Sequence, residues 1–441
     1  MRIQLPDKVH RIIDTLEMAG YEAYAVGGCV RDSILGRKPD DWDITTSAKP
    51  EEIKRLFSRT IDTGIRHGTV TVLLSGQCFE VTTYRIDGEY EDSRHPNEVT
   101  FTASLSEDLR RRDFTINAMA YNDRSGLVDV YGGISDMENQ VIRCVGNAGE
   151  RFGEDALRML RAVRFSGQLG YRIEESTREA IKKLAPNLQK ISAERIQAEL
   201  IKLVVSPHPD YLRTAYETGI TAQILPEFDL CMETPQRHKH HCYDVGEHIL
   251  HSMLLVEPDK VLRLGMLFHD IGKPQTLTVD ADGTTHYKRH PYEGEKITRK
   301  VMRRLKFDND TTDKVTKLVL YHDYDIAPTE AGVRRAMNRM GEDIFSMIFT
   351  VRRADIGAQS DYMREEKLAK VAYIEKLYQN ILSRKDAVTL KDLAISGRDL
   401  LAEGMPAGRQ IGETLAALLE KVLDDPDLNR REILLKLSKE L

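Results

Sequence analysis

The spacing of hydrophobic and polar positions changes near residue 143. Before that point, short apolar or β-branched runs alternate with helical segments, and the predicted strands are Tyr24–Val26, Trp42–Thr45, Gly68–Leu74 and Cys78–Tyr84. A helix is expected over Val30–Leu35. From about residue 147, apolar residues recur every three or four positions to the C-terminus, which is typical of helices. The pattern predicts an α+β fold, with an N-terminal α/β head that carries a small mixed sheet and an all-helical remainder.

Composition divides the helical part further. Eight of the 13 histidines fall between His238 and His290, so one helical block differs from those before and after it. We therefore predict four parts. They are a head (1–143), a helical neck (144–207), a helical body (208–365) and a helical tail (366–441).

Charge and cysteine content narrow the class of protein. The net charge of −6 counts against a dedicated nucleic-acid binder, but residues 143–205 hold 12 Lys and Arg against eight Asp and Glu, which suits a local RNA-binding surface. The five scattered cysteines indicate neither a disulfide framework nor a cysteine zinc site. No signal peptide and no run of about 20 apolar residues is found, so we expect a cytoplasmic protein without a membrane partner.

The head carries two aspartates that suit a metal ion. On the expected strand, Asp41 and Asp43 would point to the same side, where two hard oxygens can hold Mg²⁺ together with substrate phosphates. Gly27 and Gly28 before a helix would let backbone N–H groups approach a triphosphate. The helix would add Arg31, and the later strand a third carboxylate, Glu80. A lone D-x-D or G-G is most often an ordinary turn, so the prediction depends on their combination.

A longer stretch carries a family resemblance. The segments, in order, are AVGGCVRDSILGRKPDDWDITTSAKPEEI, IDTGIRHGTVTVL, LRRRDFTINAMAY, GLVDVYGGISDMENQVIRCVG, GEDALRMLRAVRF and SAERIQAEL. They resemble the class II nucleotidyltransferases, which comprise the bacterial CCA-adding enzymes and their poly(A) polymerase relatives. The resemblance implies that the 3′-hydroxyl of tRNA attacks the α-phosphate of CTP or ATP, with two Mg²⁺ ions at Asp41 and Asp43. It also implies that Gly28, Arg31 and Arg112 contact the nucleotide.

The helical neck is expected to select the base of the incoming nucleotide. We expect a helix on which Asp155, Arg158, Arg161 and Arg164 form one charged stripe, which without context is an ordinary solvated face. By the resemblance, Asp155 and Arg158 act as a protein template, and Arg161 and Arg164 lie nearer the triphosphate or brace the pair. An acceptor beside a donor matches the Watson–Crick edges of C and A and not those of U and G. Asp113 and Asn117 either brace the loop that holds Arg112 or contact substrate.

The histidine-rich block contains a second candidate site. The pattern H…HD…H…H…D resembles the HD phosphohydrolase superfamily, whose members bind one or two divalent metals. The expected ligands are His248, His269, Asp270 and Asp355, with His290 and His322 as further ligands. Mixed nitrogen and oxygen ligands suit Mn²⁺, Ni²⁺, Fe²⁺ or Zn²⁺. The substrates that this resemblance implies are phosphate monoesters or 2′,3′-cyclic phosphates. We set aside His238, His240, His241, His251 and His286 as surface or core residues.

Three functions remain open from the sequence. The preferred one is template-independent addition of C, C and A to the 3′ end of tRNA. A poly(A) polymerase or an A-adding-only enzyme would use the same head, although His67-Gly68-Thr69 resembles the tRNA enzymes and the long loop Asp87–Glu98 favours an enzyme that can add A. The alternative from another class is an HD phosphohydrolase with an RNA-binding head. By the resemblance, the tail holds the arms of tRNA.

Overall fold

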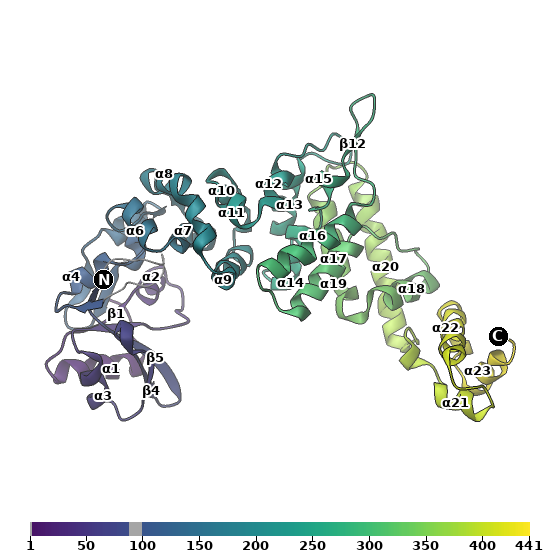
Figure 1. Cartoon of the computed structure of the whole chain (residues 1–441), viewed down its shortest axis with the longest axis horizontal. Coiled ribbons are helices and arrows are strands. Elements are labelled where there is room, and N and C mark those ends of the chain that lie inside the picture. The colour runs from purple at the N-terminus through teal and green to yellow at the C-terminus, as the bar shows by residue number, and fades with distance from the viewer. Residues whose placement is uncertain (1, 88–98) are drawn as a thin grey trace. The chain divides into compact units, whose positions relative to one another are not determined.

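The computed structural model describes residues 2–87 and 99–441 and contains two compact units (Figure 1). Unit 1 is Met1–Pro226 and unit 2 is Glu227–Leu441. The division into four parts remains a prediction. The loop Asp87–Glu98, apart from its first residue, lies outside the described residues.

Unit 1 begins with a seven-stranded mixed sheet of order β3-β4-β5-β2-β1-β8-β9. The strands are β1 (Ala23–Val26), β2 (Ile44–Thr46), β3 (Thr60–Gly64), β4 (Thr69–Leu74), β5 (Gln77–Thr83), β8 (Met119–Asn122) and β9 (Gly126–Asp129). Only β2 and β5 run parallel, with Ile44 opposite Val81. The predicted α/β head with a mixed sheet is therefore confirmed.

Helices α1 (Asp7–Met18), α2 (Gly28–Ile34), α3 (Pro50–Leu56), α4 (Leu105–Arg110) and α5 (Gly133–Glu138) accompany the sheet. The apolar face of α1 (Val9, Ile12, Ile13 and Leu16) is fully buried, as its spacing requires. A cluster of buried side chains that includes Val26, Tyr84 and Leu109 fixes the end of β1 against α4 and β8. The turn between β1 and α2 therefore starts from a rigid base.

The rest of unit 1 is helical, as predicted. Its helices are α6 (Ala148–Glu154), α7 (Leu157–Leu169), α8 (Glu175–Leu184), α9 (Ala193–Val204), α10 (Leu212–Glu217) and α11 (Ile220–Ile224). The remaining short strands of the unit are β6 (Arg85–Asp87), β7 (Val99–Phe101), β10 (Val141–Ile142) and β11 (Arg172–Ile173). The sequence predicted one helix through Asp155, but α6 ends at Glu154 and α7 begins at Leu157. Asp155 has extended backbone angles, which break the helix between them.

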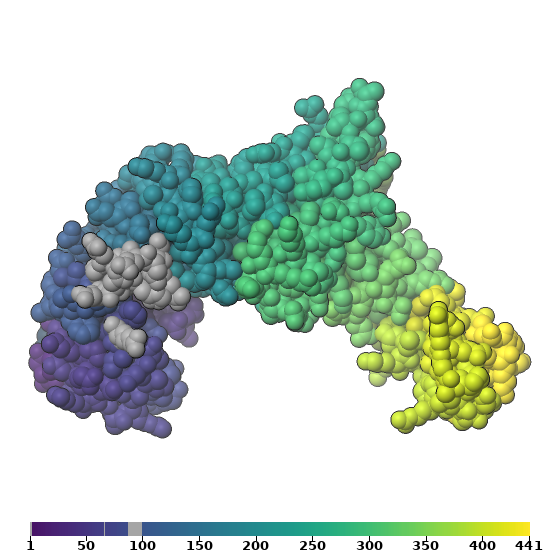
Figure 2. All heavy atoms as spheres, viewed as in Figure 1, coloured from purple at the N-terminus to yellow at the C-terminus, as the bar shows by residue number. Residues whose placement is uncertain are grey.

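Unit 2 is a stack of helices with one small hairpin. The helices are α12 (Pro226–Met232), α13 (Val245–Leu254), α14 (Lys260–Phe268), α15 (Lys273–Thr276), α16 (His290–Arg304), α17 (Asn309–Tyr321), α18 (Glu330–Met340), α19 (Glu342–Gly357), α20 (Arg364–Arg384), α21 (Gly397–Ala402), α22 (Arg409–Asp424) and α23 (Arg431–Ser438). The hairpin pairs β12 (Thr278–Val279) with β13 (Thr285–His286). Helices α21–α23 gather at one end of the unit, in yellow in Figure 2. No helix within residues 2–87 and 99–441 has the length and apolar content of a membrane span.

Candidate active sites

Three carboxylates meet at one edge of the head sheet. Asp43 directly precedes β2, and its carbonyl accepts a 3.0 Å hydrogen bond from the Val26 N–H of β1. Glu80 lies on β5, one residue before the Val81 that faces Ile44. Partial desolvation by the surrounding chain and the negative charges of Asp43 and Asp41 raise the pKa of Glu80, and partial desolvation and Asp41 raise that of Asp43 against the opposing effect of Arg112, although all three side chains keep access to solvent. Each carboxylate is thus within electrostatic reach of the other two.

One detail of the sequence prediction is wrong. The strand was expected over Trp42–Thr45, with side-chain alternation aligning Asp41 and Asp43. The strand begins at Ile44, so both aspartates lie on the extended segment that leads into it. The ladder stops there because only the carbonyl of Asp43 reaches β1. The two carboxylates remain open to solvent, which leaves them accessible to a ligand.

The turn after β1 packs directly against an arginine. Gly27 has a φ of 84°, and a Cβ built there would lie 2.9 Å from Arg112 Nη1. Arg112 Nε is buried and has no hydrogen-bond partner among the described residues. A buried donor without a partner, beside three carboxylates, is an arrangement that a bound anionic ligand would satisfy. Gly28 is the first residue of α2, as the sequence reasoning required.

Asp113 and Asn117 brace this part of the head. Arg31 Nη1 donates to Asn117 Oδ1 at 2.6 Å, and Asn117 Nδ2 donates to Asp113 Oδ1 at 3.1 Å. Arg161 donates to Asp113 Oδ2 through Nε and Nη2, at 2.9 and 2.7 Å. Burial alone would raise the pKa of Asp113, but Arg161 and the Asn117 amide outweigh it and lower that pKa. Asp113 and Asn117 therefore connect Arg31 to Arg161 through hydrogen bonds.

The residues expected to read the base are held by other partners. Asp155 accepts from Arg195 Nη1 and Nη2 at 3.2 and 2.7 Å, and from the Leu157 N–H at 3.0 Å. Arg158 donates to Glu154 and to the Arg111 carbonyl, the latter at 3.1 Å. Asp155 therefore caps the start of α7 instead of standing on its charged stripe.

Glu199 of α9 binds the last two arginines of the charged stripe, Arg161 and Arg164. Arg164 Nε donates to Glu199 Oε2 at 2.8 Å, and Arg161 Nη1 lies 3.7 Å from Glu199 Oε1. The Arg164 guanidinium also lies 3.5 Å from the centre of the Phe165 ring. Sequence reasoning assigned no role to Arg195 or Glu199, although both lie in SAERIQAEL, one of the segments that carried the resemblance.

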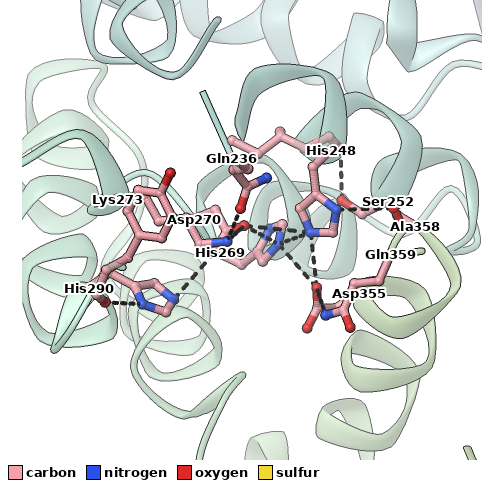
Figure 3. A network of polar contacts seen from close by, with 12 residues as sticks. Gln236, His248, Ser252, His269, Asp270, Lys273, His290, Asp355, Ala358 and Gln359 are labelled. Carbon is pink, nitrogen blue, oxygen red and sulfur yellow. Dashed lines mark hydrogen bonds and ion pairs between the residues drawn. The ribbon is translucent and has the colours of Figure 1, made fainter. Parts of the chain in front are cut away.

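The candidate HD ligands converge in unit 2 from five places, and Figure 3 labels all of them except His322. His248 lies on α13 and Asp355 on α19, His269 and Asp270 directly follow α14, His290 begins α16 and His322 directly follows α17. His248 Nε2 is 2.9 Å from Asp355 Oδ1 and 3.2 Å from His269 Nε2. His290 Nε2 and His322 Nε2 are also 3.2 Å apart. All six predicted ligands therefore meet at one place.

Asp270 lies between two groups of ligand atoms. Its Oδ2 is 3.5 Å from His248 Nε2 and 3.3 Å from His269 Nε2, while its Oδ1 is 3.3 Å from His290 Nε2 and 3.7 Å from His322 Nε2. In each group the ligand atoms lie within 4.8 Å of one another, close enough for one ion. The arrangement has room for two cations that share Asp270.

All four imidazoles are oriented by backbone carbonyls. The Nδ1 atom of His248 lies 3.3 Å from the Ala358 carbonyl oxygen, and that of His269 lies 2.7 Å from the Met266 carbonyl oxygen. The Nδ1 atom of His290 lies 2.9 Å from the Tyr287 carbonyl oxygen, and that of His322 lies 2.8 Å from the Val319 carbonyl oxygen. A carbonyl oxygen only accepts, so each Nδ1 carries a ring proton, and each Nε2 is directed at the centre of the cluster, where a carboxylate binds it when it is protonated and a metal ion can bind it when it is not. Such second contacts are typical of metal-binding histidines.

The electrostatics around Asp270 and His269 favour positive charge, whereas burial and the neighbouring histidines lower the pKa of His322 to about 3. Burial alone would raise the pKa of Asp270, but His269 and Lys273 hold it well below its usual range. Burial lowers the pKa of His269, and Asp270 with Asp355 outweighs that effect and raises it. Lys273 Nζ donates to Asp270 Oδ2 at 2.6 Å and to Gln236 Oε1 at 2.7 Å. Sequence reasoning did not identify Lys273 or Gln236, because their role depends on packing.

Comparison with known proteins defines the class. Residues 23–143 match the poly A polymerase head domain, residues 170–232 the RNA and SrmB-binding site of polymerase A, and residues 292–437 the tRNA nucleotidyltransferase domain 2. The head and the site at its sheet edge are thus those of a nucleotidyltransferase.

Relatives that match nearly the whole chain identify the family within this class. The CCA-adding enzyme of Lactobacillus helveticus is 38% identical over 95% of this chain and 94% of its own length, and that of Enterococcus faecalis is 35% identical over 97% and 94%. The crystal structure of the Bacillus stearothermophilus CCA-adding enzyme in complex with CTP has 31% identity and a TM-score of 0.76, covering 99% of this chain and 98% of the other. The chain belongs to the family of CCA-adding enzymes.

Proposed function

We propose that this chain adds C, C and A to the 3′ end of tRNA from CTP and ATP at the sheet edge of unit 1. The observation that carries the proposal is the meeting of Asp41, Asp43 and Glu80 beside the Gly27 turn and the unpartnered Arg112 Nε. Full-length likeness to CCA-adding enzymes supports it, and the poly(A) polymerase, A-adding-only and RNA-binding phosphohydrolase alternatives are not favoured.

The residues of this site fit Mg²⁺, the divalent ion that the family generally uses. Asp41 and Asp43 would hold it, and it would supply charge neutralisation at the reacting phosphates. Glu80 adds negative charge to the same place. The N–H groups around Gly27 and Gly28 and the guanidinium of Arg112 would bind the triphosphate. Arg31 contributes by holding Asn117, so we propose that it positions this wall of the site.

Asp155 and Arg158 would select the base. Asp155 keeps acceptor capacity while it binds Arg195, because each carboxylate oxygen accepts more than one hydrogen bond. Arg161 and Arg164 would hold the wall behind the pair through Asp113 and Glu199. The helical tail, residues 366–441, would contact the body of tRNA.

Extension assays test this function. The protein is offered tRNA that ends at the discriminator base, at C and at CC, with CTP and ATP supplied separately. Growth that stops after CCA supports the proposal. A long A tail would identify a poly(A) polymerase, addition only to the CC end would identify an A-adding enzyme, and no incorporation with any acceptor would exclude the whole class.

We infer a second function for unit 2, metal-dependent phosphohydrolysis at the six-ligand cluster. Four Nε2 atoms and two carboxylates directed at one another fit two divalent cations such as Mn²⁺, Ni²⁺, Fe²⁺ or Zn²⁺. The metals would supply Lewis acidity, and Lys273 would hold Asp270 in place. The test combines the metal content of the purified chain, measured by mass spectrometry, with hydrolysis of 4-nitrophenyl phosphate by His269→Ala and the wild type. Absence of metal from the reconstituted wild type would contradict the inference.

A further inference from the structure

The six-ligand cluster lies where two cavities join. One has a volume of about 380 Å³ and the other of about 350 Å³, so each is large enough for a small organic group. The residues that line both are His240, His241, His322, Asp323, Asp355 and Gln359. Two of these, His322 and Asp355, belong to the cluster itself. A phosphate at the cluster would therefore have open space on both sides.

The first cavity, which we name the hairpin arm, is lined by charged side chains of both signs, with three aspartates on the side of the cluster. Its wall includes Lys288 and Arg289, both exposed, next to the ligand His290. Arg289 has a φ of 67°, an uncommon backbone conformation for a residue with a side chain. Its guanidinium packs over the ring of Tyr292, 5.7 Å from the ring centre. The hairpin arm thus offers positive charge and no extended apolar wall.

The second cavity, which we name the helical arm, combines an apolar wall with basic residues. The buried side chains of Ile356, Val371 and Ile374 form the wall, on α19 and α20. Lys367 donates to Gln359 Oε1 at 2.7 Å, so its ammonium group is held at the joint of the two arms.

Arg352 adds a cation to the helical arm. Its guanidinium makes no hydrogen bond or ion pair with the described residues, and it is partly exposed. Burial raises the pKa of Asp323, which lines both arms, and the charge of Arg352 opposes that rise and also acts on Asp325. The next residue, Arg353, is paired with Glu375 at 2.7 Å and lines neither arm. The helical arm could therefore hold a flat apolar group such as a nucleobase against its wall, with Arg352 close to an anion.

We propose that the cluster hydrolyses acyclic phosphodiesters with a substituent in each arm, a nucleoside in the helical arm and a second polar substituent in the hairpin arm. This rests on the proposed hydrolase function and deepens it. Water adds to phosphorus and one ester P–O bond breaks. The leaving alcohol takes a proton from the water, so that a phosphomonoester and an alcohol result. A monoester or a 2′,3′-cyclic phosphate carries its organic part on one side only and would leave one arm filled with water.

The test compares matched diesters and monoesters on the full-length chain loaded with Mn²⁺. Bis(4-nitrophenyl) phosphate is compared with 4-nitrophenyl phosphate, and the dinucleotide UpU with uridine 2′,3′-cyclic phosphate. We expect a kcat/KM for each acyclic diester about tenfold or more above that of its comparator, because only the diester places a second substituent in the hairpin arm while the first occupies the helical arm. Equal or better turnover of the monoester and the cyclic phosphate would overturn the proposal.

Variants in the helical arm separate this proposal from the hydrolase function. Arg352→Ala is expected to weaken binding of a phosphorothioate dinucleotide, measured by calorimetry, and to raise KM for UpU more than for 4-nitrophenyl phosphate. Arg353→Ala is the matched control and should change neither. If Arg352→Ala raises KM equally for UpU and for 4-nitrophenyl phosphate, the two-arm assignment is wrong and the proposed hydrolase function is unaffected. If the chain binds no Mn²⁺ and hydrolyses none of the four phosphate esters, the two-arm assignment and the hydrolase function are both wrong.

Discussion

His248 Nε2 lies 3.2 Å from His269 Nε2, and the Nδ1 of each ring faces a backbone carbonyl. Both Nε2 atoms are therefore directed at each other, and His248 Nε2 also faces Asp355 Oδ1 at 2.9 Å. Such close contacts between acceptor atoms need a proton or a metal ion between them. His290 and His322 repeat the arrangement on the other side of Asp270. A divalent cation on each side of Asp270 would satisfy these atoms.

Metal binding should consequently stabilise unit 2. We expect Mn²⁺ or Zn²⁺ at a hundred times its dissociation constant to raise the free energy of unfolding by about 2.7 kcal/mol. Calorimetric melting of the chain with chelator and with added metal measures the effect. His269→Ala should abolish the metal-dependent shift, whereas His251→Ala, whose ring stacks on Tyr243 away from the cluster, should retain it. An identical melting temperature with chelator and with metal would contradict the assignment.

Asp43→Ala should stop nucleotide incorporation. The substitution removes a carboxylate that interacts with Asp41 and Glu80, and we expect a loss of about a thousandfold or more in extension of tRNA with CTP. Asp40→Ala is the control, since this neighbouring exposed carboxylate is not part of the site. Hydrolysis of 4-nitrophenyl phosphate by unit 2 should be unchanged in both variants. Normal extension by Asp43→Ala would show that the metal assignment in the head is wrong.

The fold class is predictable from the sequence because apolar residues recur at different spacings in strands and in helices. The change from mixed to helical spacing separates the sheet from the helices that follow it, and the four strands that were predicted lie within two residues of β1, β2, β4 and β5. Strands β3, β8 and β9 of the same sheet were not predicted. The predictions are wrong where tertiary contacts, and not the local sequence, set the backbone conformation. The DxD segment leaves the ladder because β1 reaches only the carbonyl of Asp43, and Asp155 leaves the helix where it binds Arg195.

The site residues were predictable to different degrees. The glycine turn and the two aspartates have local spacing that indicates phosphate and metal chemistry, whereas the HD ligands span residues 248–355 and were identified through a resemblance. Arg195, Glu199 and Lys273 are ordinary charged residues in the sequence, and only packing reveals what they hold. Likewise, His241 was set aside but lines both arms of the cavity.

Gly27 and Gly28 should respond differently to alanine. At Gly27 a methyl group meets both a φ of 84° and Arg112 Nη1 at 2.9 Å, and we expect Gly27→Ala to destabilise unit 1 by about 1–2 kcal/mol. At Gly28 the contact is an ordinary 3.7 Å to Arg31, so Gly28→Ala should cost less than about 1 kcal/mol. Trp42 is the single tryptophan of the chain and lies in unit 1, so its fluorescence in urea measures both values. Equal destabilisation would contradict the assigned backbone geometry.

Displacement of Arg112 should also weaken nucleotide binding in the Gly27→Ala variant. The same fluorescence, followed during titration with CTP, provides the dissociation constant because Trp42 lies between Asp41 and Asp43. We expect the constant to rise about tenfold, the loss of one charge-assisted hydrogen bond. An unchanged constant would mean that Arg112 does not contact the triphosphate.

Asp113→Asn should destabilise unit 1 in a pH-dependent way. Asp113 is buried and paired with Arg161, so the amide would remove the nearer of the two negative charges beside Arg161 and leave only Glu199 at 3.7 Å, at a cost of roughly 3 kcal/mol at pH 7. The folded-state pKa of Asp113 is depressed, so its stabilising effect is complete above the unfolded pKa of about 3.9 and decreases as the pH falls below it. The difference between wild type and variant should therefore be constant from pH 7 to about pH 5 and smaller at pH 3. Urea denaturation followed by Trp42 fluorescence measures this difference in the free energy of unfolding. Asp62→Asn is the control, because Asp62 pairs with Lys54 on the surface, and it is expected to change stability by at most about 1 kcal/mol. A difference that does not vary with pH would show that the carboxylate of Asp113 is not ionised in the folded protein.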